Sequence, residues 1–199
     1  MNFITTLIQR PGQRRAIGIA AQVLPHLRRG ERILDIGSGT CQVAKIIIDH
    51  GYDVALVDIT DNSLVPDVHP QLYDGKRLPF PRDSFDLALL LTVLHHIPHP
   101  DGTLVEARRV ARRIVIIEDV FTSKTEMWLT RIGDSWLNRQ IFGHPYSNRS
   151  DQGWRETFAR LNLHLVDVRQ NIHWFFPFRF RHAIYLLSRD DGAEGTGPS

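Results

Sequence analysis

The sequence predicts an α/β fold built on a doubly wound, mostly parallel sheet. Three short apolar runs, Arg32–Ile36, Asp53–Asp58 and Phe85–Leu91, fit strands that are covered on both faces of such a sheet. Helical patterns separate strand patterns along the first part of the chain, which is typical of βαβ units. The last strand patterns follow each other directly and indicate an antiparallel pair.

The first βαβ unit contains the stretch around which the chain is organised. Gly37 and Gly39 follow the first strand at once, and a helix is expected over residues 40–50. Glycines allow a sharp turn and a close approach of the backbone to a ligand. The helix N-terminus directs unpaired N–H groups toward that ligand. An ordinary tight turn without a ligand is the alternative.

The residues around this turn favour a cationic ligand over a dinucleotide. Gln42 stands where the dinucleotide pattern G-x-G-x-x-G has its third glycine. Asp35, two residues before Gly37, would repel a pyrophosphate and attract a cation. S-adenosylmethionine carries an ammonium and a sulfonium and no phosphate, so the D-x-G-x-G arrangement fits it better.

A second carboxylate follows at the end of the next strand. Asp58 lies about twenty residues after the glycine turn, where a carboxylate accepts hydrogen bonds from the ribose hydroxyls of an adenosine. The alternative is an aspartate that caps the next turn. The spacing to the glycine turn favours ribose binding.

Composition limits the class of protein. With 199 residues, 42% of them hydrophobic, residues 1–188 are expected to form one domain, and the small polar residues 189–199 a disordered tail. The net charge of +2 gives no reason to expect a nucleic-acid partner. Cys41 is the only cysteine, and neither a secretory signal nor a membrane span is recognisable, so a cytoplasmic protein is expected. No metal ion is expected, and the oligomeric state stays open.

The remaining elements follow from periodicity and from glycine and proline positions. Near the N-terminus we expect one helix over residues 2–9, ending before Pro11, and a second over 13–27, with Ile17, Ala20 and Ala21 on its buried face. Further helices are expected over 101–110, 123–142 and 150–161, strands over 71–73, 113–120, 163–171 and 181–188, and an aromatic connection over 173–180. Residues 123–161 would form a helical cover.

With these residues in view, the chain resembles the class I S-adenosylmethionine-dependent methyltransferases, and among them the small type 11 group that includes quinone-ring methyltransferases. The matching pieces lie between residues 31 and 120: Leu34 to Thr40, Asp58, Asp74 with Leu78-Pro79-Phe80, Ser84-Phe85-Asp86 and Leu94-His95-His96-Ile97. The resemblance implies a Rossmann-like sheet of seven strands, the last antiparallel.

The resemblance also implies a set of cofactor contacts. Asp35, Gly37 and Gly39 would surround the methionine part of S-adenosylmethionine, and Asp58 would hold the ribose. Around the adenine the implied residues are Ile59, Asp74 and Gly75, and Thr92 would lie under the sulfonium. Two family features are missing, namely the helix between Asp58 and Tyr73 and a Pro-Gly-Gly turn before the fifth strand, so the substrate need not be a quinone.

The expected function is in-line methyl transfer to a small, apolar or aromatic acceptor. Candidates for a general base are His96, His95 and Asp119, with Glu118 as the alternative to Asp119 because strand neighbours point in opposite directions. His144 and Tyr146 are candidates for the acceptor site. The rival functions are a non-catalytic S-adenosylmethionine-binding module and a nicotinamide-dependent oxidoreductase, which Asp35 and Gln42 disfavour.

Overall fold

A computed structural model describes residues 3–120, 149–175 and 178–189 of the chain, with side chains for 12–120, 149–170 and 182–189. The expected helix over 123–142, the acceptor-site candidates His144 and Tyr146 and the expected tail lie outside the described residues.

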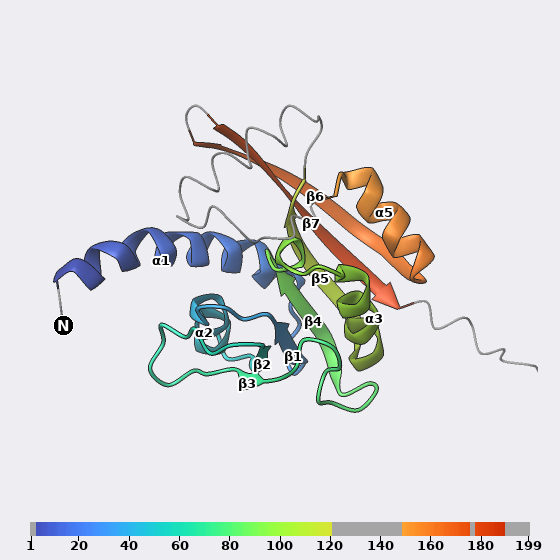
Figure 1. Ribbon diagram of the computed structural model, residues 1–199, viewed down its shortest axis with the longest axis horizontal. Helices are drawn as coiled ribbons and strands as arrows, with labels where there is room; N and C mark the ends of the chain where they lie inside the picture. Colours follow the sequence, from blue (N-terminus) through green and yellow to red (C-terminus); the bar gives the residue numbers. More distant parts are fainter. Residues whose placement is uncertain (1–2, 121–148, 176–177, 190–199) are drawn as a thin grey trace, which may run out of the picture.

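The described strands form one sheet in the order β3-β2-β1-β4-β5-β7-β6 (Figure 1). The first five pair in parallel: β1 (Arg32–Ile36), β2 (Asp53–Asp58), β3 (Gln71–Leu72), β4 (Phe85–Leu91) and β5 (Ala111–Asp119). The order reverses between β1 and β4, and open α/β sheets bind ligands at the carboxyl ends of the strands beside such a switch point. The predicted doubly wound sheet is therefore confirmed.

The last two strands are longer than predicted. β6 (Leu163–Phe175) and β7 (Phe178–Arg189) pair antiparallel, and β7 also pairs antiparallel with β5. The sequence predicted an aromatic connection over residues 173–180, and that prediction is wrong for most of its length. Aromatic residues favour extended backbone, and each added pair of residues satisfies further backbone groups, so the hairpin continues through them.

Helices cover both faces of the sheet (Figure 1). α1 (Phe3–Val23) and α2 (Gln42–Asp49) pack on the face that holds Ile33, Leu87 and Val115. α3 (Pro100–Val110) and α5 (Asp151–Arg160) pack on the opposite face, where Trp154 and Phe158 are buried. Alternate residues of β5 serve the two cores, so neighbouring side chains at its end face different helices. None of the described helices is long and apolar enough to cross a bilayer.

The N-terminal segment differs from the prediction. It forms one helix, α1, which runs through Pro11 and ends in a short 3-10 turn, η1 (Leu24–His26). A proline removes one backbone hydrogen bond but does not end a helix whose following turns are held by packing. The buried face agrees only in part: Ala20 is buried as predicted, but Ile17 and Ala21 are exposed, and Ala16 and Ile19 are buried instead.

A compact loop replaces the helix expected between β2 and β3 in the methyltransferase pattern. The Ser63 hydroxyl accepts from the Val65 amide (3.0 Å) and contacts the Val68 carbonyl (2.6 Å). The two ring nitrogens of His69 face acceptors, the Pro66 carbonyl at 2.9 Å and Asp61 Oδ2 at 2.8 Å. The Pro66 carbonyl, followed by Asp61, raises the pKa of His69, because only the imidazolium donates to both. Side chains therefore hold this loop without a helix.

The glycine turn between β1 and α2 yields a stability prediction. Gly37 has a φ of 74°, and a Cβ there would lie 2.3 Å from Val93 Cγ2. Gly39 has a φ of 52°, but a Cβ there would meet no atom within 4 Å. We expect Gly37→Ala to lower the free energy of unfolding by more than about 2 kcal/mol, because left-handed strain and a steric clash add.

The matched control for Gly37→Ala is Gly39→Ala, which adds only the left-handed strain of about 1–2 kcal/mol. Urea unfolding of the two variants beside the wild-type chain measures both effects. Equal losses for the two alanine variants would contradict the close packing of Gly37 against Val93.

Candidate cofactor site

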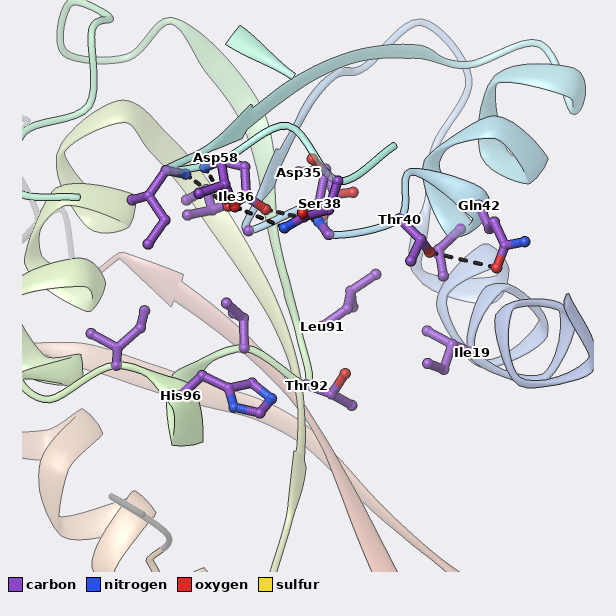
Figure 2. A pocket seen from close by; sticks show the side chains of 18 of the residues that line it. Ile19, Asp35, Ile36, Ser38, Thr40, Gln42, Asp58, Leu91, Thr92 and His96 are labelled. Atoms are coloured by element: carbon purple, nitrogen blue, oxygen red, sulfur yellow. Dashed lines mark hydrogen bonds between the residues drawn. The ribbon is translucent and has the colours of Figure 1, made fainter. Parts of the chain in front are cut away.

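A cavity of about 920 Å³ opens at the carboxyl ends of β1, β2 and β4. The eight residues predicted to hold the cofactor all line it: Asp35, Gly37, Gly39, Asp58, Ile59, Asp74, Gly75 and Thr92. Figure 2 shows Asp35 and Asp58 on one wall of this cavity, and Thr92 and His96 on the opposite wall. The fold therefore brings together residues that lie more than fifty positions apart, Asp35 and Thr92 among them.

Asp35 is a buried acidic side chain on the wall of the cavity. Only 3% of its surface is exposed, and its carboxyl makes no hydrogen bond to any residue in the described part of the chain. Burial, and then the charge of Asp58, raise the pKa of Asp35 to about 7. A buried carboxyl without a partner is costly, and an ammonium group placed beside it would remove that cost.

Asp58 holds the glycine turn in place from the end of β2. Its Oδ2 accepts from the Gly39 amide at 2.8 Å, and its Oδ1 accepts from the Ile59 amide at 2.7 Å. Oδ1 also accepts from the Thr60 amide at 3.3 Å, so the remaining acceptor capacity of Asp58 for a ligand hydroxyl lies on Oδ2, which has a second lone-pair site. The side chain therefore connects the turn after β1 with the end of β2 and remains able to bind a ribose.

The far end of the cavity combines an apolar side chain with a carboxylate. Ile59 is 62% exposed, although it is a large apolar residue, and its Cγ2 lies 3.1 Å from the Cβ position of Gly75. Asp74, which also lines the cavity, accepts from the amides of Lys76 and Arg77 with its Oδ1. An apolar surface beside a carboxylate suits a planar ring that carries an amino group.

Thr92 lies directly after β4 in a conformation that is uncommon for its residue type. Its φ is 56°, and its amide donates to the Ile117 carbonyl at 2.7 Å. Left-handed backbone at a β-branched residue is strained, and such strain is concentrated at functional sites. The β4–β5 ladder fixes this strained residue on the cavity wall.

The base candidates have different surroundings. His96, in the turn η2 (Leu94–His96), lines the cavity. His95 Nδ1 lies 2.6 Å from Glu118 Oε2, and the other oxygen of Glu118 accepts from the Leu94 amide at 2.7 Å. Glu118 is fully buried, on the side of the sheet that faces α3 and α5. Glu118 therefore fixes the turn that presents His96.

Asp119 faces the opposite side of the sheet and pairs with a histidine. His182, its register partner on β7, places Nε2 at 2.8 Å from Asp119 Oδ1. Burial opposes ionisation of Asp119, but the contact with His182 and the charges of His95 and Arg15 outweigh it and lower its pKa. Asp119 and His95 are not among the residues that line the cavity.

Sequence reasoning missed the contribution of α1 to the cavity. Gly12, Arg15, Ala16 and Ile19 line one side of it, although they precede β1 in the chain. The loop residues Asn62 and Leu64, and Tyr73 after β3, complete the other side. The apolar spacing of α1 predicted an amphipathic helix but gave no sign that this helix covers the end of the sheet.

Comparisons with known proteins agree with this arrangement. A family model for a methyltransferase domain, of type 11, matches residues 34–116. The ubiquinone/menaquinone biosynthesis C-methyltransferase UbiE of Cupriavidus metallidurans is 30% identical over 162 residues, or 64% of this chain and 65% of that protein. The chain thus spans less than two thirds of the length of this relative.

Solved structures share the fold. The magnesium protoporphyrin IX methyltransferase of Synechocystis PCC 6803, solved with bound S-adenosylhomocysteine, has a TM-score of 0.64 at 17% identity, over 95% of this chain and 88% of that one. The [4+2]-cyclase SpnF has a TM-score of 0.66 at 16% identity, over 91% and 82%. The family model, the sequence relatives and the fold support a class I S-adenosylmethionine-dependent methyltransferase of the type 11 group.

Proposed function

We propose that the protein transfers a methyl group from S-adenosylmethionine to a small, apolar or aromatic acceptor by in-line displacement. The observation that carries this proposal is Asp35, a buried carboxyl that has no hydrogen-bond partner among the described residues and lines a large cavity beside the glycine turn. A buried carboxyl without a partner is costly in its ionised form, and a cationic ligand beside it would offset this desolvation cost.

The assignment of the cofactor follows the cavity from the glycine turn outward. Asp35 would bind the ammonium of the methionine part, while Gly37 and Gly39 allow the backbone to approach it. Beyond the turn, Asp58 would accept from the ribose hydroxyls, Ile59 would pack on the adenine, and Asp74 beside Gly75 would accept from the adenine amino group. The second lone-pair site of Asp58 Oδ2 and the position of Asp74 on the cavity support these roles.

S-adenosylmethionine supplies an activated methyl group on a sulfonium, so the chain mainly has to align the reacting atoms. Thr92, fixed by the β4–β5 ladder, would lie under the sulfonium and set the direction of transfer. Alignment of this kind contributes on the order of 7–11 kcal/mol to lowering a barrier when it is well achieved.

The apolar or aromatic character of the acceptor is proposed from the cavity wall opposite Asp35 and Asp58. Apolar side chains surround Thr92 there: Ile19, Leu91, Val93, Ile97 and Pro98. A cavity of about 920 Å³ is at the large end of the range for small-molecule sites, which leaves room for an acceptor beside a cofactor. The name of the Cupriavidus relative, a quinone-pathway C-methyltransferase, supports an aromatic ring as the acceptor.

A general base is required only for acceptors that lose a proton. We propose His96 for this role, because it lines the cavity near Thr92. His95 and Asp119 stay predictions for this role, although neither lines the cavity. His144 and Tyr146 stay predictions for the acceptor site.

A ligand panel tests the proposed function. S-adenosylmethionine and S-adenosylhomocysteine should each raise the melting temperature of the full chain, since a ligand at about a hundred times its dissociation constant adds about 2.7 kcal/mol. NAD and NADP should give no shift. Transfer of a labelled methyl group to catechols or hydroquinones then measures the reaction itself. A shift with NAD or NADP alone would contradict the proposal, and binding without transfer would favour a non-catalytic module.

Asp35→Asn is expected to raise the stability of the folded chain and to weaken binding of the cofactor. Because the folded-state pKa of Asp35 is about 7 and its ordinary value 3.8, its ionised form destabilises the folded chain above pH 7, and this cost disappears as the pH falls toward 4. We expect Asp35→Asn to raise the free energy of unfolding at pH 8 by up to about 4 kcal/mol, and to leave it unchanged near pH 4. The same variant should bind S-adenosylhomocysteine at least tenfold more weakly.

The control for Asp35→Asn is Asp53→Asn, which removes an exposed carboxylate at the start of β2, outside the cavity. Denaturant unfolding at pH 4 and pH 8, with calorimetric titration of S-adenosylhomocysteine at pH 8, measures both quantities. Unchanged affinity in Asp35→Asn would remove the basis of the ammonium assignment.

A further inference from the structure

The loop between β2 and β3 forms part of the cavity wall. Asn62 and Leu64 line the cavity, and Leu64 is 53% exposed although it is a large apolar residue. The Leu64 amide donates to the Thr40 carbonyl at 3.1 Å, so this part of the loop lies beside the glycine turn. Ile59, which begins the loop, is exposed in the same cavity. The loop therefore presents apolar side chains where the adenosine part of the cofactor is proposed to lie.

The two halves of this loop are held in different ways. Val65 and Val68, in the second half, pack on the small apolar cluster around Cys41. The first half, residues 59–64, contributes no side chain to the described apolar clusters, although it carries the residues that line the cavity. Polar contacts therefore decide the shape of the half that would meet a ligand.

Asp61 connects these polar contacts. Its Oδ1 accepts from the Ser63 amide at 3.0 Å, and its Oδ2 lies 2.8 Å from His69 Nδ1. The other ring nitrogen of His69 lies 2.9 Å from the Pro66 carbonyl oxygen. Because Asn62 stands between Asp61 and Ser63 in the chain, the Asp61 carboxylate sets the backbone at Asn62. His69 thus holds a residue of the cavity wall through Asp61.

This arrangement requires a proton on His69. Both ring nitrogens face oxygen acceptors, and only the imidazolium donates from both. Among the described residues, the charged groups that act on the His69 ring are Asp61 and Asp67, and both favour its charged form. We propose that His69 is a positioning residue for the cofactor, whose imidazolium keeps Asn62 and Leu64 in place beside the adenosine part of S-adenosylmethionine.

This inference rests on the proposed function and makes cofactor binding depend on a proton outside the cavity. The Pro66 carbonyl and then Asp61 raise the pKa of His69, so the stabilisation is fully present below pH 6.5, the ordinary value, and is lost as the pH rises through the raised pKa. The side chains of His69 and Asp61 are 54% and 39% exposed, so solvent screens their interaction and the effect on affinity is a small factor.

Calorimetric titration of S-adenosylhomocysteine into the full chain at pH 6 and pH 9 tests the role of His69. Asp35 also titrates in this range, but it does so in the wild-type chain and in a His69 variant alike, so the ratio of the two affinities isolates His69. We expect His69→Ala to bind about threefold more weakly than the wild-type chain at pH 6, with a ratio near one at pH 9. In NMR titrations of the wild-type chain, the ligand should raise the pH at which the His69 ring loses its proton, because linkage is reciprocal.

His164→Ala is the control, since His164 is an exposed histidine of β6 that does not line the cavity, and this variant should bind as the wild-type chain does at both pH values. Wild-type affinity of His69→Ala at pH 6 would overturn the inference, and so would a loss of equal size at pH 6 and pH 9. In these two cases the proposed function stands, because the wild-type chain still binds the ligand. A wild-type chain that does not bind S-adenosylhomocysteine would overturn both.

Discussion

The site depends on two carboxylates that the parallel sheet places at neighbouring strand ends. Asp58 accepts from the Gly39 amide of the glycine turn and from the Ile59 amide after β2, and so ties the turn to the end of β2. Asp35, on the adjacent strand, is buried near that charge without a hydrogen bond among the described residues. The contact with Asp58 holds the turn, and the unfavourable burial of Asp35 makes a cationic ligand stabilising. Ionised Asp35 therefore lowers the stability of the free chain and, at the same time, favours the binding of a cationic ligand.

The sheet and the predicted cofactor residues on the cavity could be found in the sequence because their patterns are local. Buried parallel strands such as Phe85–Leu91 are continuous apolar runs, and the bounds of β1, β2 and β4 agree with the prediction. The spacing of Gly37 and Asp58 along the chain predicts that both lie at the carboxyl ends of neighbouring strands, because these ends meet at one edge of a parallel sheet. Every predicted cofactor residue consequently lies on one cavity.

The other side of the cavity could not be predicted, because its contacts join residues far apart in sequence. Nothing in the pattern around Arg15 indicates that α1 covers the end of the sheet, and Pro11 suggested a break that the helix does not have. Strand periodicity predicts that Glu118 and Asp119 point to opposite faces of the sheet. It does not predict which histidine each of them contacts. The pairs Glu118–His95 and Asp119–His182 depend on the sheet order, which brings η2 and β7 to the two sides of β5.

In the proposed site, Asp35 is a buried carboxyl whose ionised form is destabilised in the free chain and is stabilised by the ammonium of S-adenosylmethionine. Carbon-13 NMR of the aspartate carboxyls, titrated with pH in the presence and absence of S-adenosylhomocysteine, measures this directly. We expect a pKa of about 7 for Asp35 in the free chain, and a value well below that in the complex, because a bound cation favours the ionised form. An Asp35 pKa near its ordinary value of 3.8 in the free chain, or one that the ligand does not lower, would contradict the account.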